Sequence, residues 1–206
     1  MRKSHPTPPD RERLTPQTMA APPTLVIFVK EPRPGRVKTR LGAGIGLVPA
    51  AWWFRHQSQR LIRRLAGDPR WRTVLAVAPD REGMSSRIWP ACVPRQPQGA
   101  GDLGDRMMRA LGAKGPTLIV GSDIPDIVAS DIVAGFRALG DHDAVFGPAE
   151  DGGYWLIGYR HAPPKDLFRH VRWSTEHALT DTLANLRGRR VGFLRGLNDV
   201  DEAGDL

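Results

Sequence analysis

Short runs of apolar residues alternate along the chain with longer stretches in which apolar positions recur every three or four residues. The short runs have the length of buried strands and lie at 24–29, 73–78, 117–120, 143–146, 154–157 and 191–194. The longer period predicts helices over 51–65, 103–113, 130–139 and 176–186. This alternation is typical of an α/β domain whose central sheet is mostly parallel and flanked by helices.

Details within these elements refine the prediction. In the helix over 51–65, Phe54, Leu61 and Leu65 fall on one face, which is expected to face the core. Ser130 is expected to cap the helix that follows it, because its hydroxyl can accept a hydrogen bond from a free backbone N–H. The runs at 143–146 and 154–157 are separated by a glycine-rich turn, and we expect them to form a pair of strands.

The first 22 residues differ from the rest of the chain. They are rich in proline and charge and lack apolar periodicity, so we expect a disordered tail over 1–22 and a single domain over 23–206. No apolar run reaches the roughly 20 residues of a membrane span. The start also lacks the apolar segment of a signal peptide, which predicts a cytoplasmic protein. Cys92, the only cysteine, is expected to be a buried thiol.

The composition is basic, with 30 Lys and Arg against 22 Asp and Glu and a formal charge of +8. Such a charge attracts anions, including nucleic acids. The basic residues are scattered, and neither a basic stripe interleaved with aromatics nor a nucleic-acid motif is present, so we expect no nucleic-acid partner. A solvated basic surface and an anionic substrate such as a nucleotide both stay open.

The segment after the first predicted strand, 30–41, joins turn residues to cations. Its basic residues are Lys30, Arg33, Arg36, Lys38 and Arg40. Open α/β sheets bind anionic ligands at the carboxyl ends of their strands, which is where this loop is expected. The spacing fits neither a Walker A loop nor the G-x-G-x-x-G dinucleotide pattern. An exposed basic loop without a ligand is the alternative interpretation.

Two acidic segments are expected at the same edge of the sheet. Asp123 directly follows the strand at 117–120, and a carboxylate there can hold Mg²⁺ or Mn²⁺ against phosphate oxygens. The alternative is a turn-forming Asp ahead of Pro125. Glu150 and Asp151 lie in the glycine-rich turn, where a second carboxylate could approach a ligand. A hairpin whose Asp-Gly supplies the turn geometry is the alternative there.

The end of the chain offers further carboxylates. Asp199 or Asp201 could add a metal ligand from another part of the sheet edge. Asp199 and Glu202 also have the spacing of a capping box at the start of a short terminal helix, and the sequence leaves both interpretations open. His56 and His177 have no partner visible in the sequence and are interpreted as surface residues.

Six segments, taken in order, resemble a bacterial family of GT-A-type candidate glycosyltransferases. The family belongs to the nucleotide-diphospho-sugar transferase superfamily, is of the radical-SAM/selenodomain-associated transferase type, and is mostly uncharacterised. Its pattern begins with a Lys-x-Pro-x-x-Gly-x-x-Lys-Thr-Arg-Leu loop and ends with Asp-Val-Asp. The corresponding segments here are 30–41, 101–107, 121–125, 147–154, 173–175 and 199–201. After the second Asp this chain lacks the Thr-Pro-Glu that relatives tend to have.

The resemblance implies a Rossmann-like GT-A fold with a nucleotide in its first half and an acceptor in its second. By position, a nucleotide and its phosphates would be bound by Lys30, Gly35, Lys38, Arg40, Asp102 and Arg106. Asp123 would bind a divalent metal, and Asp201 is the further metal candidate. Asp151 would lie near the reacting centre. The acceptor side would include Glu150, Gly152, Gly153 and Tyr154.

These expectations lead to one main hypothesis and two alternatives. The main hypothesis is metal-dependent transfer of a sugar from a nucleotide-diphospho-sugar donor to an unknown small-molecule acceptor. The first alternative is a guanylyltransferase-like nucleotidyltransferase that releases pyrophosphate, for which Arg33 and Arg36 would suit the extra charge of a triphosphate. The more remote alternative is a non-catalytic protein that binds anions or RNA. A homodimer is possible on general grounds.

Overall fold

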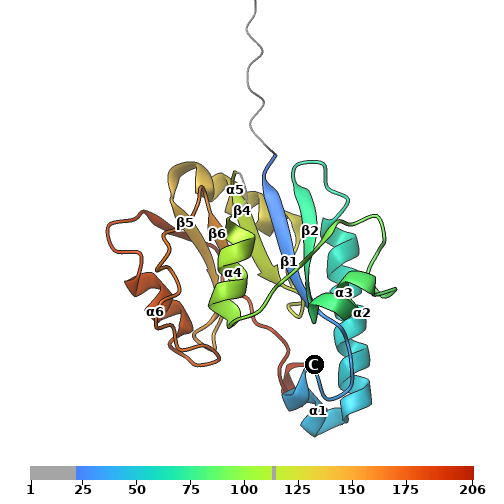
Figure 1. The fold of residues 1–206 in the computed structure, drawn as a ribbon. Helices are drawn as coiled ribbons and strands as arrows, with labels where there is room; N and C mark the ends of the chain where they lie inside the picture. Colours follow the sequence, from blue (N-terminus) through green and yellow to red (C-terminus); the bar gives the residue numbers. More distant parts are fainter. Residues whose placement is uncertain (1–21, 113–114) are drawn as a thin grey trace, which may run out of the picture.

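Seven strands form one sheet in the computed structural model, which describes residues 22–112 and 115–206. The strand order is β3-β2-β1-β4-β6-β5-β7, and β6 runs antiparallel to both of its neighbours while the other described pairings are parallel (Figure 1). The strands are β1 (Thr24–Lys30), β2 (Arg72–Ala78), β3 (Arg95–Pro97), β4 (Thr117–Gly121), β5 (Ala144–Pro148), β6 (Tyr154–Tyr159) and β7 (Val191–Phe193). The predicted α/β class with a mostly parallel sheet is confirmed.

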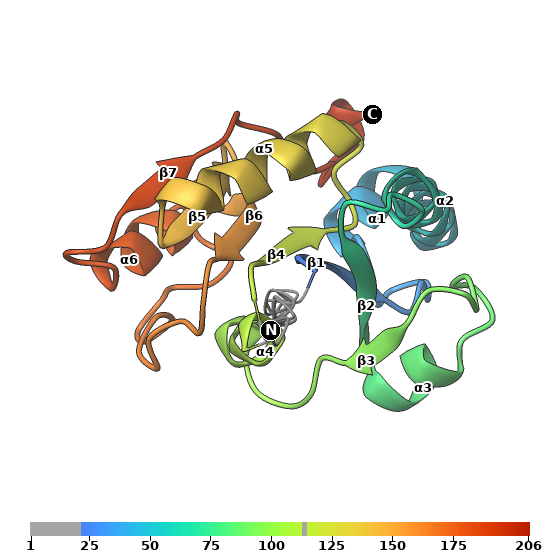
Figure 2. The same cartoon turned by 90° about the horizontal axis from the view of Figure 1, so that it is seen from above.

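Helices cover both faces of this sheet, as the view from above shows (Figure 2). One face carries α2 and α5, and the other carries α4 and α6. The helices are α1 (Thr39–Ile45), α2 (Leu47–Leu65), α3 (Asp80–Ser85), α4 (Leu103–Leu111), α5 (Ala129–Asp141) and α6 (Ala178–Ala184), with a short 3-10 helix η1 (Ala203–Asp205) at the end. No helix in the described chain is long and apolar enough to cross a membrane.

The alternation of side chains along the strands divides the core into two clusters. On β1, Leu25 and Ile27 pack with Leu61 of α2 and Ile132 of α5. Val26 lies on the opposite face and packs with residues of α4 and of the segment around α6, including Met107 and Phe168. Both faces of the sheet are therefore buried, which explains why the strands read as continuous apolar runs.

The six predicted strands and four predicted helices are present, with shifted ends. The helix predicted over 51–65 begins earlier, at Leu47, and the one predicted over 176–186 is shorter. The predicted tail over 1–22 lies outside the described residues apart from Pro22, as does residue 113 of the predicted helix at 103–113. The sequence did not predict α1, α3 or β3.

Three local predictions are wrong. Ser130 does not cap α5: the helix begins at Ala129, and the Asp131 carboxylate accepts a hydrogen bond from the backbone N–H of Val128. Cys92 is exposed, because it lies in the loop before β3 and not on a core-facing element. The proposed capping box of Asp199 and Glu202 is shifted, since the carboxylate of Asp205 accepts the N–H of Glu202.

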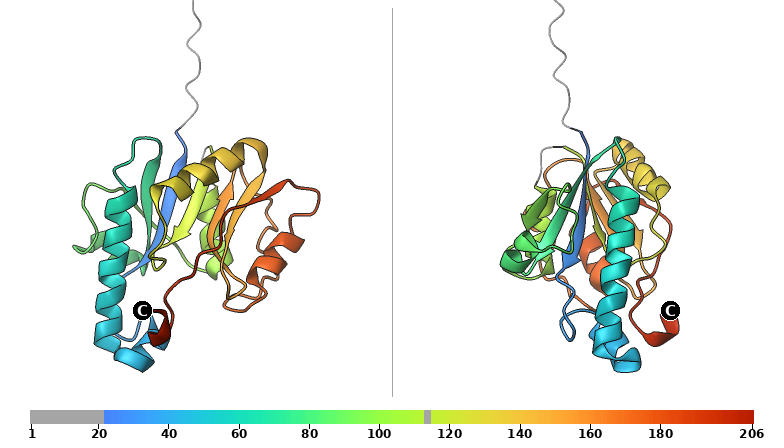
Figure 3. Two further views of the ribbon diagram at one scale, coloured as in Figure 1. Left: turned by 180° about the vertical axis from the view of Figure 1, so that it is seen from behind. Right: turned by 90° about the vertical axis from the view of Figure 1, so that its right-hand side faces the viewer.

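Two distant parts of the chain meet below the sheet in the orientation of Figure 1. The helix α1 and the beginning of α2 form an arm that projects past the carboxyl ends of β1 and β4, and the last residues cross to it, so the C-terminus lies beside α1 (Figures 1 and 3). A Cβ on Gly44 would lie 2.9 Å from the Cβ of Ala203, which shows how closely α1 and η1 approach. This crossing brings the terminal acidic segment to the basic loop.

Candidate functional site

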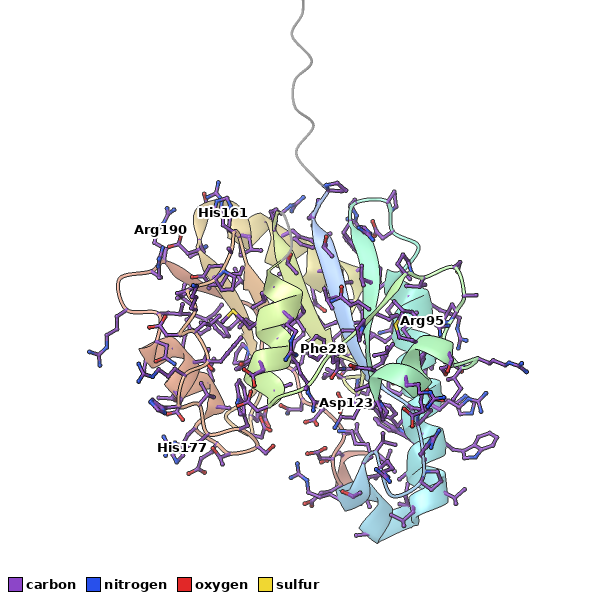
Figure 4. The ribbon with its side chains drawn as sticks, viewed as in Figure 1. Phe28, Arg95, Asp123, His161, His177 and Arg190 are labelled. Atoms are coloured by element: carbon purple, nitrogen blue, oxygen red, sulfur yellow. The ribbon has the colours of Figure 1, made fainter. Side chains whose placement is uncertain are left out.

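A cleft of about 920 Å³ opens at the edge of the sheet where β1 and β4 end. Its lining comes from parts of the chain that are distant in sequence, within 28–40, 121–124, 149–155, 173–178 and 199–201, together with Phe54, Gln98, Leu103 and Arg106. Figure 4 places Asp123 at this edge, whereas His161 and Arg190 lie at the opposite edge of the sheet. The predicted convergence of the basic loop and the acidic segments on one crevice is therefore observed.

Two rims border the cleft. We call the loop 30–40 together with Asp123, Asp199 and Asp201 the charged rim. We call residues 149–155 and 173–178 the glycine rim, after the Gly152-Gly153 turn. In the charged rim the basic loop follows β1, Asp123 follows β4, and the two terminal aspartates follow β7. In the glycine rim, residues 149–155 connect β5 to β6, and residues 173–178 lead into α6.

Lys38 lies at the centre of the charged rim. Its Nζ is 2.6 Å from Asp123 Oδ2, 2.9 Å from Asp199 Oδ2 and 2.6 Å from Asp201 Oδ1, and its side chain is only 6% exposed. The backbone of Lys38 has a left-handed conformation with φ 45° just before α1. Its neighbour Val37 is buried against Ala51 of α2, which fixes the loop and turns Lys38 toward the carboxylates.

Packing also explains how the terminal carboxylates reach Lys38. Val200 is buried against Leu41 of α1, and its N–H donates to the carbonyl of Asp123 at 3.4 Å. Asp199 and Asp201 flank Val200, and both carboxylates reach the ammonium.

Burial and charge act against each other in this cluster. Burial alone would lower the pKa of Lys38, but the three carboxylates hold that pKa above its usual range. Burial raises the pKa of Asp199, an effect that Lys38 offsets only in part because Asp123 and Asp201 add like charge. Burial also acts to raise the pKa of Asp201, yet the hydrogen bond from Lys38 outweighs it and holds the pKa below its usual value.

The carboxylates of the charged rim fit a divalent metal by their chemistry. Mg²⁺ and Mn²⁺ prefer oxygen donors, and all three carboxylates have an oxygen within 2.9 Å of a single point. That point is the ammonium nitrogen of Lys38. In residues 22–112 and 115–206 no three His, Cys, Asp or Glu side chains are already arranged as a metal site. Direct coordination by this set therefore requires Lys38 to move.

The other cations of the basic loop have different environments. Arg40 pairs with Asp201 and keeps 68% of its side chain exposed. Lys30 and Arg36 line the cleft. Gly35 does not line it; its φ of 75° serves the turn of the loop. Lys30, Arg36 and Arg40 thus line the same cleft as Lys38.

Asp102 and Arg106 were predicted at the nucleotide site, and only one of them lines the cleft. Arg106 does so, with its Nε donating to the carbonyl of Gly101 at 3.1 Å. Asp102 caps α4 through a reciprocal pair of hydrogen bonds with Asp105. Its second oxygen accepts the indole N–H of Trp173 at 3.2 Å, so Asp102 ties the start of α4 to the glycine rim.

The glycine rim is held by close backbone packing. A Cβ on Gly152 would collide with the carbonyl of Glu176, and the Gly152 carbonyl accepts the N–H of Leu179 at 3.0 Å. Asp151 lines the cleft, and its Oδ1 accepts the N–H of Gly153 at 2.9 Å. The turn that presents Asp151 is therefore fixed against the segment before α6.

The remaining acceptor-side candidates divide between the cleft and its surroundings. Gly153 and Tyr154 line the cleft, whereas Glu150 is exposed outside it, with its N–H bound to Asn198 Oδ1 at 3.0 Å. Burial raises the pKa of Tyr154. The Tyr154 hydroxyl is buried beside the Thr182 side chain and makes no well-aligned hydrogen bond among the described residues.

Sequence reasoning missed Gln98 as a cleft residue. Gln98 is 4% exposed, and its amide nitrogen donates to the carbonyls of Val29 at 3.2 Å and Ala76 at 2.9 Å. It thereby joins the ends of β1 and β2 below the cleft. A single Gln in a proline- and glycine-rich stretch carries no local signal of this position, because its partners are 69 and 22 residues away.

Comparison with solved structures defines the class. A candidate nucleotide-diphospho-sugar transferase from Desulfovibrio desulfuricans G20 has 32% sequence identity and a TM-score of 0.80, covering 88% of this chain and 83% of that one. At 10% identity, a 4-diphosphocytidyl-2C-methyl-D-erythritol synthase from Anaerococcus prevotii DSM 20548 gives a TM-score of 0.52 over 90% and 95% of the two chains. The chain thus has the fold of nucleotide-diphospho-sugar transferases and cytidylyltransferases.

The family follows from the sequence. Residues 61–175 match the family described as uncharacterised protein conserved in bacteria (DUF2064), and the chain belongs to this family. No functionally curated protein is detectably similar in sequence. A further structure, Rv0371c of Mycobacterium tuberculosis H37Rv in complex with manganese, shares the fold at 13% identity and a TM-score of 0.51, over 90% of this chain and 96% of that one. The resemblance drawn from the motifs is confirmed at the level of family and fold.

Proposed function

We propose that the protein is a metal-dependent glycosyltransferase that uses a nucleotide-diphospho-sugar donor. The observation that carries this proposal is the charged rim, where Lys38 and three carboxylates converge at the carboxyl edge of the sheet and face Asp151 across one cleft. Cations and carboxylates together suit a diphosphate bound through a divalent metal, since either charge alone would repel one of the two ligands. The 32% identity to a candidate nucleotide-diphospho-sugar transferase supports the same reaction class.

Each rim has a distinct part in the proposed reaction. Lys38, Lys30 and Arg36 neutralise the donor's diphosphate as it becomes the leaving group. Asp123, Asp199 and Asp201 would hold a divalent ion, which would supply electrostatic stabilisation of the same phosphates. Asp151 accepts the proton of the acceptor hydroxyl as that oxygen attacks the anomeric carbon. Gln98 and Phe54, both buried, form part of the cleft lining.

The glycine rim favours sugar transfer over the guanylyltransferase-like alternative. In the guanylyltransferase-like alternative a phosphate acceptor attacks the nucleoside triphosphate, which requires cations on the acceptor side. The described cleft residues within 149–178 include Asp151 and Glu176 and no Lys, Arg or His. This electrostatic surface suits a neutral or cationic acceptor. The cytidylyltransferase fold of the distant neighbours keeps nucleotidyl transfer as the second candidate.

A panel of nucleoside diphosphates, triphosphates and nucleotide sugars, each with and without Mn²⁺, tests the proposal by thermal denaturation. A ligand at 100 times its dissociation constant stabilises the folded state by about 2.7 kcal/mol, which raises the melting temperature by several degrees. We expect metal-dependent stabilisation by one nucleotide sugar in the wild type and its loss in Asp123→Asn. Asp126→Asn is the matched control, because Asp126 is exposed in the same turn and lies outside the cleft.

The products separate the candidate reactions. Release of a nucleoside diphosphate from the stabilising donor supports glycosyl transfer, and release of pyrophosphate from a triphosphate supports nucleotidyl transfer. Stabilisation by oligonucleotides alone, unaffected by metal or by Asp123→Asn, would show the non-catalytic binding protein instead. Absence of stabilisation by every donor tested would refute the transferase proposal.

A further inference from the structure

The ammonium of Lys38 lies where the three carboxylates of the charged rim converge. Its distances to their oxygens, 2.6–2.9 Å, are those of charge-assisted hydrogen bonds. The ammonium donates hydrogen bonds to Asp199 and Asp201 and forms an ion pair with Asp123. In this arrangement Lys38 is therefore committed to carboxylates and is not oriented toward a phosphate.

Lys38 and a metal cannot share this position. Mg²⁺ sits about 2.0–2.1 Å from its oxygen ligands, and an ammonium 2.6 Å from the same oxygens would place two cations almost in contact. Removing Lys38 without replacement is also unfavourable, because three partly buried carboxylates would then face each other with only Arg40 to offset them. The charged rim thus favours one central cation at a time.

The cleft beside Lys38 offers its side chain an alternative position away from the carboxylates. The cleft that begins beside its Nζ is lined on the same rim by Lys30, Arg36 and Arg40, where an anion would be attracted. The four-carbon stem of Lys can rotate while Val37 keeps the backbone fixed. A move of the ammonium from the carboxylates to bound phosphates leaves the carboxylates to a divalent ion.

We propose that Lys38 is an intramolecular counter-ion that a divalent metal displaces, and that the donor's phosphates then receive its ammonium. The proposal rests on the proposed function for the identity of the phosphates, but the displacement itself concerns only the metal and this chain. It has a thermodynamic consequence: metal alone binds weakly because it competes with Lys38, and the donor relieves that competition. Metal and donor therefore bind cooperatively.

Manganese binding without any nucleotide tests the displacement directly. The EPR signal of free Mn²⁺ is measured as the ion is titrated into the wild type, Lys38→Met and Lys30→Met. Removing the competing charge is expected to tighten Mn²⁺ binding roughly tenfold or more in Lys38→Met. Lys30→Met removes the same charge from the same cleft without touching the carboxylates, and we expect a change of no more than about twofold because water and salt screen it.

A second measurement uses the wild-type protein and does not depend on the variant folding. Brief acetylation followed by peptide mass spectrometry reports how accessible each lysine amine is. Lys38, at 6% exposure, is expected to react slowly without metal and at least about tenfold faster with saturating Mn²⁺, once it has left the carboxylates. Lys30, which is exposed, serves as the internal reference.

The outcomes distinguish this inference from the proposed function. Tighter Mn²⁺ binding by Lys38→Met, with metal-induced acetylation of Lys38 in the wild type, supports the displacement. Equal or weaker binding by Lys38→Met, a Lys38 that stays protected at saturating Mn²⁺, or no Mn²⁺ binding by either protein overturns it. None of these results depends on a donor, whereas the transferase proposal fails only in the donor panel and product assays.

Discussion

The two rims of the cleft are built on opposite principles. The charged rim is held by ion pairs between residues that are far apart in the sequence, with Lys38 joined to Asp199 and Asp201. The glycine rim is held by close packing, because Gly152 lies against the backbone of Glu176. Ion pairs can exchange partners when a ligand arrives, whereas packed backbone resists displacement. The charged rim is therefore suited to adapt to a donor, and the glycine rim to hold an acceptor and a base in fixed positions.

The largest expected effect lies on the glycine rim. Asp151→Asn keeps the oxygen that accepts the Gly153 N–H and so preserves the turn, but it removes the proposed base. We expect turnover, measured as nucleoside diphosphate release, to fall about 10²–10⁴-fold. Donor binding should change by no more than about twofold, because the charged rim is intact.

Glu150→Gln is the control for Asp151→Asn, since Glu150 is the adjacent carboxylate and lies outside the cleft. Its turnover should stay near that of the wild type. If Asp151→Asn and Glu150→Gln had equal turnover, Asp151 would not be the base, and the functional contrast between the two rims would be lost.

A smaller effect, on stability, tests whether the glycine rim is rigidly packed. Gly152 has φ 78° and its Cβ would meet the Glu176 backbone, whereas Gly188 has φ 77° with open space around it. Gly188→Ala is expected to cost about 1 kcal/mol of unfolding free energy for the left-handed conformation alone. Gly152→Ala should cost at least about 2 kcal/mol more, because backbone must also shift.

Urea denaturation of the two alanine variants at neutral pH measures this difference. The shared φ cancels in the comparison, which leaves the cost of the contact with Glu176. Equal losses in Gly152→Ala and Gly188→Ala would mean that the turn is free to move, so that both rims would be adaptable.

The two rims also differ in how far the sequence could predict them. The strands that carry the rims are buried apolar runs such as 24–29, so the strands and the α/β class of the domain could be predicted directly from the pattern. The helix α1 could not be predicted in this way, because its two glycines have low helix propensity. It forms where Leu41 is buried and where Gly42 lets α2 approach closely, and both are tertiary effects.

Within the site, the sequence predicted the segments and not their pairing. Lys38, Asp123 and Asp201 each belong to a local motif, so their presence at the sheet edge could be expected. The expected partner of Lys38 was a phosphate, and no feature of the sequence around Lys38 indicates that it would bind carboxylates. The contacts of Lys38 with Asp199 and Asp201 join residues that are separated by 161 and 163 positions in the sequence. They depend on the burial of Val200 against the α1–α2 arm.

The smallest expected effect concerns two hydroxyls on β6. Tyr154 and Tyr159 lie at the two ends of this strand, and both hydroxyls are buried. The Tyr154 hydroxyl lies beside the Thr182 side chain without a well-aligned hydrogen bond, and that of Tyr159 has no partner among the described residues. A buried hydroxyl that makes no hydrogen bond contributes little to stability, so Tyr154→Phe and Tyr159→Phe should each keep the unfolding free energy within about 1 kcal/mol of the wild type or raise it. The edge-to-face packing of Tyr154 on Phe146, at 5.3 Å between ring centroids, survives the change to Phe.

The KM for the acceptor is expected to differ between the two tyrosine variants, because only Tyr154 lines the cleft. If the acceptor reaches the Tyr154 hydroxyl, which is buried in the free protein, Tyr154→Phe should raise the KM for the acceptor about 2–10-fold, the worth of one neutral hydrogen bond. Tyr159→Phe should leave KM unchanged. A loss of more than about 1 kcal/mol of stability in both variants would show that folded-state partners satisfy the hydroxyls. The rigid glycine rim would then hold Asp151 in place without a polar group set aside for the acceptor.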